Sequence, residues 1–295
     1  MKSNKVSSFV YLSIVMAMLF WAMSYVWIKI VYQCYNPITT VFIRLVIASP
    51  LTYAAARWLK KLQPIQRRDI KFFILISLLQ PFLYFMFESY GLKFASPTVA
   101  AVIVSTIPLF TPIAAFYLFK EKLSLLNIVG LLVSFTGVLL VIIKADFSLA
   151  VSPMGLVLLL LAVVAGVAYI NSVKKISFNY NALTIVTYQN ILGTFWFLPF
   201  FLVVDLGHFL NAAPTSDVLI SLGLLALLPT SLAFILFAYS VKELGASRSS
   251  MFGNIIPVFT AAFAWLMLND EISIRMMIGI AVVITGLFAA QVRKK

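Results

Sequence analysis

The chain contains an internal repeat. Residues 90–143 align without a gap with a second stretch that begins at residue 239, an offset of 149 residues (239 − 90). The aligned pairs include prolines, glycines and an acidic position, namely Pro108 with Pro257, Glu121 with Asp270, Gly130 with Gly279 and Gly137 with Gly286. Unrelated apolar helices would share Leu, Ile and Val, but not these residues in one register. We therefore interpret the chain as a duplicated unit.

Composition excludes a soluble fold. Of the 295 residues, 63% are hydrophobic and 11% are charged. Apolar runs of about twenty residues recur along the chain, each long enough to cross a ~30 Å hydrocarbon core at ~1.5 Å per residue. The chain is therefore predicted to be an all-α membrane protein. Cys34 and His208 are the single cysteine and the single histidine, so a disulfide framework and a His- or Cys-based metal site are excluded. No metal and no cofactor are expected.

Polar breaks divide the chain into ten predicted spans. They cover residues 9–31, 37–58, 71–92, 97–119, 125–143, 154–175, 181–204, 217–240, 247–268 and 273–292. The longest connections between them, 59–70 and 205–216, are too short to form a soluble domain. An extramembrane catalytic module is therefore ruled out.

Lys and Arg residues are distributed unevenly about these spans. With the N-terminus placed inside, 17 of the 22 basic residues lie in or beside the inner loops, whereas Lys93, Lys144 and Arg275 lie outside. Because positively charged loops stay on the cytoplasmic side, both termini are predicted to be cytoplasmic. We expect a multi-pass protein of the cell membrane, a bacterial inner membrane in particular. The net charge of +13 then reflects topology and contact with anionic lipid, not nucleic-acid binding.

Each copy of the repeat holds five spans. Outside the strong match, the copies align more weakly near an offset of 145, for example Asn36 on Asn181. We assign residues 1–145 to the first repeat and 146–295 to the second. Because five is odd, the second copy enters the membrane in the opposite sense, which predicts ten transmembrane helices in two inverted five-helix repeats. Inverted repeats are typical of secondary transporters, in which two similar halves let one site open to each side in turn.

These motifs resemble one known family. Each copy has a central proline, a short acidic turn ending in Ser and two glycines in its last span, which are Pro108, 121–124, Gly130 and Gly137, and then Pro257, 270–273, Gly279 and Gly286. The pattern resembles the EamA-type branch of the drug/metabolite transporter superfamily over essentially the whole chain, with Asp270 in place of Glu. The resemblance implies ten helices with both ends cytoplasmic, and export of amino acids or other small metabolites.

Two prolines lie near the middle of equivalent spans. Pro108 and Pro257 each remove a backbone donor and free the carbonyl four residues back. In hydrocarbon this is tolerated only where the backbone faces protein or a wet cavity. One interpretation is a packing kink. The other is that both prolines are hinges, on stripes that line a central cavity and include Ser105 and Asn254.

The third span carries a polar stripe. Ser77, Gln80, Tyr84, Glu88 and Gly91 follow one another at spacings of three and four, which places them on one helix face. Polar atoms are costly in lipid. This face is therefore expected to point into the helix bundle.

Glu88 is the only acidic residue well inside a span, and Arg44 is the only basic residue at comparable depth. Glu88 could pair with Arg44 and serve structure or gating. Without a partner, Glu88 would favour its neutral, protonated form and become a candidate proton carrier. A third alternative is that the Glu88 side chain snorkels to the outer interface. Arg44 could also snorkel, or it could hold a substrate carboxylate. The second repeat has Gln189 at the matching position, so the charge is not duplicated.

Further inward-facing residues complete a predicted substrate cavity. Its expected residues are Trp21, Tyr25, Arg44, Gln80, Tyr84, Glu88, Ser105, Tyr169, Gln189, Asn190 and Asn254, with Asn171 and Tyr188 as additional candidates. Taken singly, an aromatic residue in a membrane span is more often an interface anchor or a core residue. Together these residues would form a mostly apolar pocket with a few polar anchors, which suits a small amphiphilic ligand.

The sequence favours a secondary transporter that exports small metabolites such as amino acids by alternating access around a midplane cavity. Two alternatives stay open: a multidrug exporter of lipophilic cations, for which Glu88 is the only available cavity carboxylate, and a non-transporting scaffold or lipid-handling protein. The motifs of intramembrane hydrolases and phosphate-binding loops are missing, so an enzyme is not expected. The expected partners are a small-molecule substrate and the lipid bilayer; coupling to protons is left open.

Overall fold

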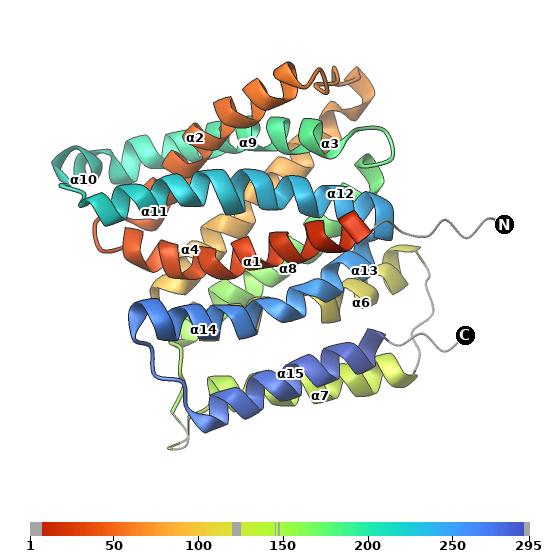
Figure 1. The fold of residues 1–295 in the computed structure, drawn as a ribbon, viewed down its shortest axis with the longest axis vertical. Coiled ribbons are helices and arrows are strands. Elements are labelled where there is room, and N and C mark those ends of the chain that lie inside the picture. The colour runs from red at the N-terminus through yellow and green to blue at the C-terminus, as the bar shows by residue number, and fades with distance from the viewer. Residues whose placement is uncertain (1–7, 120–124, 145, 147, 292–295) are drawn as a thin grey trace.

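The computed structural model describes residues 8–119, 125–144, 146 and 148–291. Within these residues the chain is almost entirely helical (Figure 1), and seven helical segments are long and apolar enough to cross a membrane. Three shorter apolar helices, Pro97–Thr111, Ile128–Ile142 and Ile274–Gly286, bring the described set to ten. These segments correspond one to one with the ten predicted spans, which confirms an all-α membrane protein.

The helices follow the order of the predicted spans. The first five spans are α1 (Ser8–Val31), α2 (Pro37–Trp58), α3 with α4 (Ile70–Ser77, Tyr84–Lys93), α5 with α6 (Pro97–Val104, Ile107–Phe119) and α7 (Leu125–Ile142). The second five are α8 (Pro153–Ile176), α9 (Ala182–Phe200), α11 with α12 (Ser216–Leu227, Phe234–Leu244), α13 with α14 (Ala246–Met251, Ile256–Leu268) and α15 (Ile274–Gln291). The short α10 (Leu206–Asn211) extends α9. The first acidic turn, at 121–124, lies outside the described residues.

The last helices of the two repeats, α7 and α15, pack side by side and antiparallel (Figure 1). At Gly137 the backbone of α7 lies against Val283, and at Gly286 the backbone of α15 lies against Ser134. A shift of 149 residues converts Ser134 into Val283 and Gly137 into Gly286, so the two contacts are one contact seen from either repeat. Equivalent helices that run in opposite directions are what an inverted repeat requires. The boundary between residues 145 and 146 stays a prediction, and residue 145 lies outside the described residues.

The second helices of the repeats, α2 and α9, are also antiparallel, and a carboxylate joins them at one end. Asp205, which follows α9, accepts hydrogen bonds from the backbone N–H of Thr39 at 3.0 Å and from its hydroxyl at 2.9 Å. The same carboxylate accepts one from the amide of Asn36 at 3.3 Å. Thr39 lies in the first turn of α2, where backbone donors have no partner within the helix and negative charge is stabilising. A residue of one repeat thus caps a helix of the other.

The opposite ends of α2 and α9 meet in the equivalent way. Asn181 precedes α9 and donates from its amide to the carbonyl of Lys61 at 2.7 Å, and its backbone N–H donates to Gln63 at 2.7 Å. Thr184 donates to the same Lys61 carbonyl at 3.0 Å. Asn181 and Thr184 are the counterparts of Asn36 and Thr39 at the predicted offset of 145. The weaker sequence match between the first halves of the repeats therefore corresponds to equivalent contacts in the structure.

Asp205→Ala is expected to destabilise the protein by about 1–3 kcal/mol, because it leaves the buried donors of Thr39 and the half-buried amide of Asn36 without an acceptor. The measurement is the melting temperature of the purified protein in detergent. Asp217→Ala is the matched control, since Asp217 is an exposed acid in the first turn of α11. Equal melting temperatures for the two variants would contradict the capping role.

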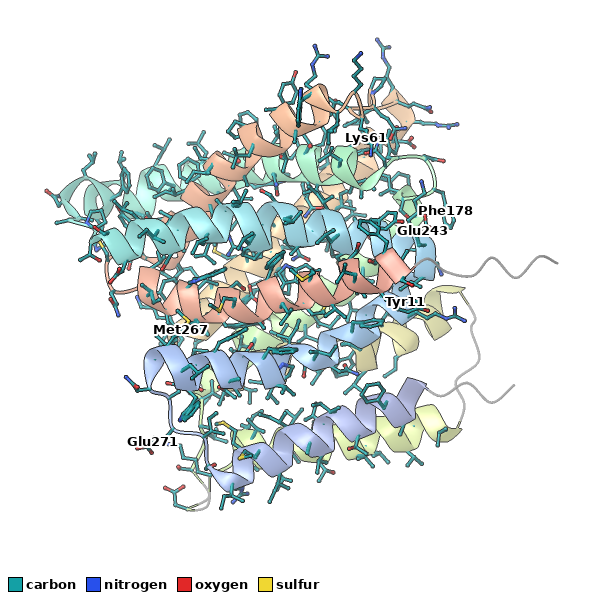
Figure 2. All side chains as sticks on the ribbon, in the orientation of Figure 1. Tyr11, Lys61, Phe178, Glu243, Met267 and Glu271 are labelled. Atoms are coloured by element: carbon teal, nitrogen blue, oxygen red, sulfur yellow. The ribbon has the colours of Figure 1, made fainter. Side chains whose placement is uncertain are left out.

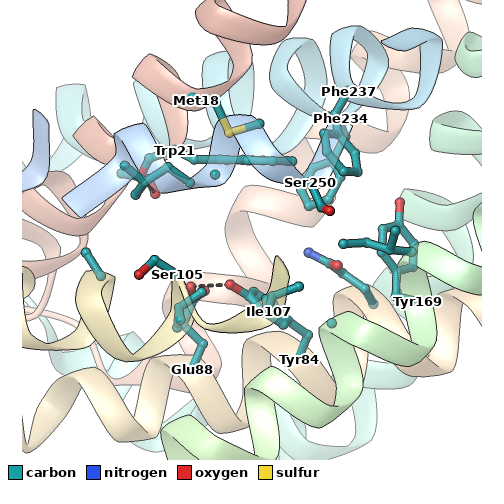
Figure 3. Close-up of a pocket in the computed structure, with 18 of the residues that line it drawn as sticks. Met18, Trp21, Tyr84, Glu88, Ser105, Ile107, Tyr169, Phe234, Phe237 and Ser250 are labelled. Carbon is teal, nitrogen blue, oxygen red and sulfur yellow. Dashed lines mark hydrogen bonds between the residues drawn. The ribbon is translucent and has the colours of Figure 1, made fainter. Parts of the chain in front are cut away.

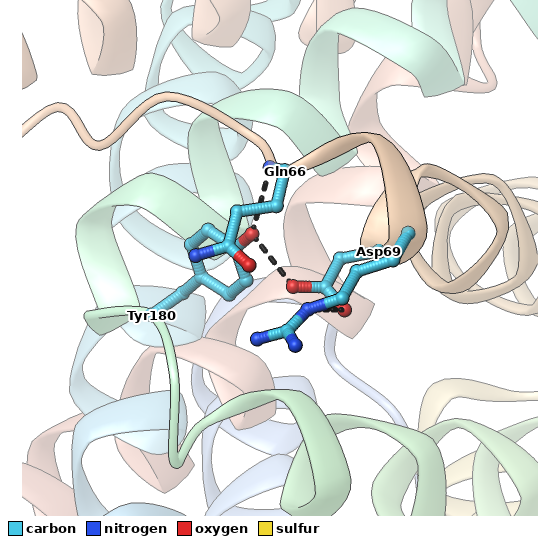
Figure 4. A network of polar contacts seen from close by, with 4 residues as sticks. Gln66, Asp69 and Tyr180 are labelled. Atoms are coloured by element: carbon cyan, nitrogen blue, oxygen red, sulfur yellow. Dashed lines mark hydrogen bonds and ion pairs between the residues drawn. The ribbon is translucent and has the colours of Figure 1, made fainter.

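The connection that precedes α3 is also anchored to the second repeat (Figure 4). The hydroxyl of Tyr180 donates to the buried carboxylate of Asp69 at 2.8 Å and accepts from the backbone N–H of Gln66 at 3.0 Å. Arg68 extends this cluster with an ion pair to Asp69 at 3.9 Å. The predicted basic loop at 59–70 is therefore held against the start of α9 by polar contacts.

The outside of the helix bundle is apolar along its flanks and charged at its ends. Val203, Phe195 and Leu132 are 85%, 65% and 61% exposed, as expected of side chains that face lipid. Figure 2 shows Lys61 and Glu243 at one end of the bundle and Glu271 at the other. The described chain begins and ends at the end that carries Lys61, which agrees with an even number of spans. That this end faces the cytoplasm stays a prediction.

Four of the spans are broken near their middle. The predicted hinge residues Pro108 and Pro257 are each the second residue of the helix that follows a break, in α6 and α14. Two further breaks were not predicted. Gln80 has extended dihedral angles before Pro81 (φ −150°, ψ 123°), and a π-helical turn at Leu228–Ala233 contains Pro229. Irregular backbone at membrane depth is tolerated only where it is buried in protein or lines a cavity, so these breaks indicate where a cavity lies.

Candidate functional site

A cavity of about 90 Å³ lies between the two repeats and is bordered by the broken helices (Figure 3). A void holds a water once it reaches roughly 10–15 Å³, so this one accommodates several waters or a small solute. Most of the predicted residues line it, namely Trp21, Tyr25, Arg44, Gln80, Tyr84, Glu88, Ser105 and Tyr169, together with the hinge residue Pro108. The meeting place of the inverted repeats is therefore open and partly polar.

Six predicted residues do not line the cavity: Gln189, Asn190, Asn254, the hinge residue Pro257 and the additional candidates Asn171 and Tyr188. Gln189 is buried behind the cavity wall and accepts a hydrogen bond from the Tyr169 hydroxyl at 2.9 Å, so it supports a lining residue. Asn190, Asn254 and Pro257 are buried but are not among the lining residues. For Asn254 the reason is helical rotation, because it lies in a 3₁₀ turn (Phe252–Ile255), where one residue turns the side chain by about 120°, and it is the preceding glycine that lines the cavity. Depth in the membrane was predictable, but orientation about the helix axis was not.

Glu88 is held in the cavity wall by two tyrosines. Its Oε1 atom accepts hydrogen bonds from the Tyr84 hydroxyl at 2.7 Å (Figure 3) and from the Tyr25 hydroxyl at 3.0 Å. Glu88 is 6% exposed, and both tyrosines that donate to its Oε1 atom are buried as well. The alternative that Glu88 snorkels to the membrane interface is therefore wrong. The polar stripe of the third span thus faces inward, as predicted.

Arg44 is fixed to the opposite repeat. Its Nε donates to the Thr230 hydroxyl at 2.7 Å, and the guanidinium carbon lies 4.4 Å from the centre of the Phe85 ring. Thr230 donates in turn to the carbonyl of Leu225 at 2.6 Å, a backbone group next to the break that contains Pro229. Arg44 is 2% exposed, so it does not snorkel.

The predicted ion pair between Arg44 and Glu88 is not formed. Within the described residues these two side chains do not approach to 4.0 Å, and each has hydrogen-bond partners of its own. Thr230 and the two tyrosines hold them apart on the walls of one cavity. Both side chains therefore remain available to a ligand, and the alternative in which Glu88 carries a proton stays open.

An aromatic wall completes the cavity, and the sequence did not reveal all of it. The Trp21 ring packs against Phe234 and Phe237 with ring centres 5.1 Å apart in both cases. Its indole N–H donates at 3.2 Å to the carbonyl of Pro229. Phe234 and Phe237 are three residues apart and begin five residues after the midspan Pro229, and that spacing is the signal that could have identified them.

A lysine and an aspartate interact where the ends of α1 and α14 meet. Lys29, near the end of α1, and Asp270, just after α14, are close enough to interact electrostatically. Burial raises the pKa of the Asp270 carboxyl, and the Lys29 charge opposes that rise. Their counterparts in the other copies are Lys174 and Glu121, and Glu121 lies outside the described residues.

Two antiparallel five-helix repeats around a largely apolar cavity, which holds a few polar and charged side chains and is bordered by broken helices, define an inverted-repeat membrane protein of the transporter class. Comparison with known families agrees, because the EamA-like transporter family matches residues 8–143 and again residues 153–290. The chain belongs to the EamA-like transporter family, within the drug/metabolite transporter superfamily, and is a transporter.

Three curated relatives align with most of this chain. An uncharacterized transporter of Archaeoglobus fulgidus is 25% identical over 94% of this chain and 96% of its own length. The uncharacterized transporter YoaV of Bacillus subtilis is 26% identical over 95% of each chain. A probable terminal-alkyne amino-acid exporter of Streptantibioticus cattleyicolor is 24% identical over 86% of this chain and 84% of its own. A solved crystal structure with 17% identity aligns with a TM-score of 0.73 over 97% of this chain and 99% of that chain, which shows the shared fold.

Proposed function

We propose that the protein is a secondary transporter that exports small amphiphilic metabolites, amino acids among them, by alternating access around the cavity between its repeats. The observation that carries this proposal is the cavity itself, which combines an aromatic wall with two separated charged side chains, Arg44 and Glu88. Such a pocket suits a ligand with both apolar and charged parts. The relative named as an amino-acid exporter supports the same direction.

The symmetry of the fold supports alternating access. Two similar halves of opposite orientation can exchange conformations, so that a site between them opens first to one side and then to the other. The breaks before Pro108 and Pro257 lie at equivalent positions of the two halves. In this proposal they are the hinges, the first repeat spans residues 1–145 and the second spans 146–295. Both termini are cytoplasmic.

Counterflow in proteoliposomes tests the proposal. Vesicles containing the purified full chain are preloaded with one unlabelled solute, and entry of the same labelled solute is followed for a panel of amino acids and for tetraphenylphosphonium. We expect entry of at least one amino acid to exceed that into protein-free vesicles. A pH gradient imposed on the same vesicles tests coupling to protons.

The other outcomes of this experiment identify the rival functions. Counterflow of tetraphenylphosphonium alone, abolished by Glu88→Gln, would make the protein an exporter of lipophilic cations. Movement of a fluorescent lipid between leaflets without solute counterflow would make it a lipid-handling protein. Either result contradicts the proposed function.

A further inference from the structure

The two charged residues of the cavity are incompletely paired, and this defines the charges of the ligand. We propose that the cavity binds a zwitterion, with Arg44 holding its carboxylate, Glu88 holding its ammonium group and the aromatic wall holding an apolar side chain. This inference rests on the proposed function and narrows it to substrates with one charge of each sign.

Arg44 is the side chain that binds the carboxylate of the ligand, and it is called the carboxylate pole below. A guanidinium has five N–H donors, and only the Nε donor of Arg44 has a hydrogen-bond partner within the described residues, the Thr230 hydroxyl. The side chain lines the cavity, and Phe85 covers one face of the guanidinium. The fork of its terminal nitrogens, which have no hydrogen-bond partner within the described residues, matches a carboxylate through two parallel hydrogen bonds. A cation this buried is costly unless an anion accompanies it.

Glu88 is the side chain that binds the ammonium group of the ligand, and it is called the ammonium pole below. Both tyrosine hydroxyls, of Tyr25 and Tyr84, donate to its Oε1 atom. Within the described residues its Oε2 atom has no hydrogen-bond partner, although a carboxylate accepts about four hydrogen bonds. Glu88 lines the same cavity as Arg44. An ammonium group, which donates three hydrogen bonds, is a chemical match for that free oxygen.

The separation of the two poles favours a zwitterion over a singly charged ligand. Arg44 and Glu88 attract each other electrostatically but make no direct ion pair, so a ligand that carries only one charge leaves the other side chain buried without a counterion in contact. A lipophilic cation would leave Arg44 unpaired, and a monocarboxylate would leave Glu88 unpaired. A zwitterion with an apolar group pairs both and packs its side chain against Trp21 and Phe234.

The test uses three solutes with one common isobutyl group. L-Leucine has both charges, isoamylamine lacks the carboxylate and 4-methylpentanoate lacks the ammonium group. Binding to the purified full chain is measured by the rise in melting temperature with ligand concentration. We expect leucine to bind at least about tenfold more tightly than either analogue, because each analogue loses a hydrogen-bonded charge pair.

Variants of Arg44 and Glu88 test which charged group of the ligand each side chain binds. Arg44→Gln should remove the preference for leucine over isoamylamine, and Glu88→Gln should remove the preference for leucine over 4-methylpentanoate. The matched controls are Arg57→Gln on the exposed side of the same helix α2 and Glu243→Gln at the exposed end of α12, which should keep both preferences. If Arg44→Gln does not fold, Arg44→Lys retains the charge without the fork, and the leucine preference should still fall.

Four results would overturn the inference. Isoamylamine or 4-methylpentanoate binding to the unmodified protein as tightly as leucine would mean that only one pole is used. Preferences unchanged in both Gln variants would mean that neither side chain contacts the ligand. Absence of leucine binding, while another solute shows counterflow, would overturn the zwitterion site but leave the proposed transport function in place. Absence of both binding and counterflow would remove the proposed function as well.

Discussion

Gly286→Ala is expected to lower the melting temperature of the purified protein by roughly 5–10 °C, corresponding to a loss of about 3 kcal/mol. A Cβ atom at this position would overlap the backbone of Ser134 on α7. Backbone atoms cannot move aside as the end of a side chain can, so α7 and α15 must separate along their whole contact.

The repeat supplies an internal check on this expectation. In Gly137→Ala the added Cβ would lie 2.5 Å from the backbone nitrogen of Val283, the equivalent contact, so a similar loss is expected. Gly223→Ala is the matched control, because a Cβ there meets no atom within 4 Å. A melting temperature unchanged in Gly286→Ala, or lowered equally in Gly223→Ala, would show that close backbone packing of α7 on α15 does not stabilise the protein.

Gly253→Phe is expected to reduce transport at least about tenfold while leaving the fold intact, because it fills the cavity. Gly253 lines the cavity, and the nearest atom to an added Cβ is Cγ of Pro108 at 3.8 Å. The added Cβ therefore meets no close atom, and the phenyl ring is expected to occupy the volume that a solute would need. The measurement is counterflow, with the melting temperature recorded in parallel.

Gly223→Phe serves as the control for this variant, since it adds the same side chain at an unobstructed position away from the cavity. Its counterflow should match that of the unmodified protein. Full transport by Gly253→Phe, at an unchanged melting temperature, would mean that the solute does not pass through this cavity.

The sequence predicted the helices closely because membrane spans have a strong and local signature. An apolar run of sufficient length must form a helix in lipid, since its backbone groups have no other partner there. The ten spans, the antiparallel repeats and the inward polar face of Glu88 could therefore be read from the chain. Asp205 was missed because its role depends on Thr39, a residue far away in the sequence.

The structure brings the predicted cavity residues together where their position on one helix face was enough to place them, and it leaves some of them out where neighbouring helices determine the cavity wall. Tyr84 and Glu88 share a face of one span, so their spacing was sufficient. Whether Arg44 meets Glu88 depends instead on Thr230, which comes from a broken helix of the other repeat. Spacing along one helix carries no information about such a partner.

The sequence by itself determined that the chain crosses the membrane ten times in two opposed copies, because apolar length, odd helix number and the register of prolines and glycines are properties of the chain alone. Tertiary structure decided which side chains border the cavity and that its two charges stay apart. Those outcomes depend on the rotation of each helix about its axis and on hydrogen bonds between repeats, such as the one from Arg44 to Thr230. Such contacts join residues that are distant in sequence, and only packing brings them together.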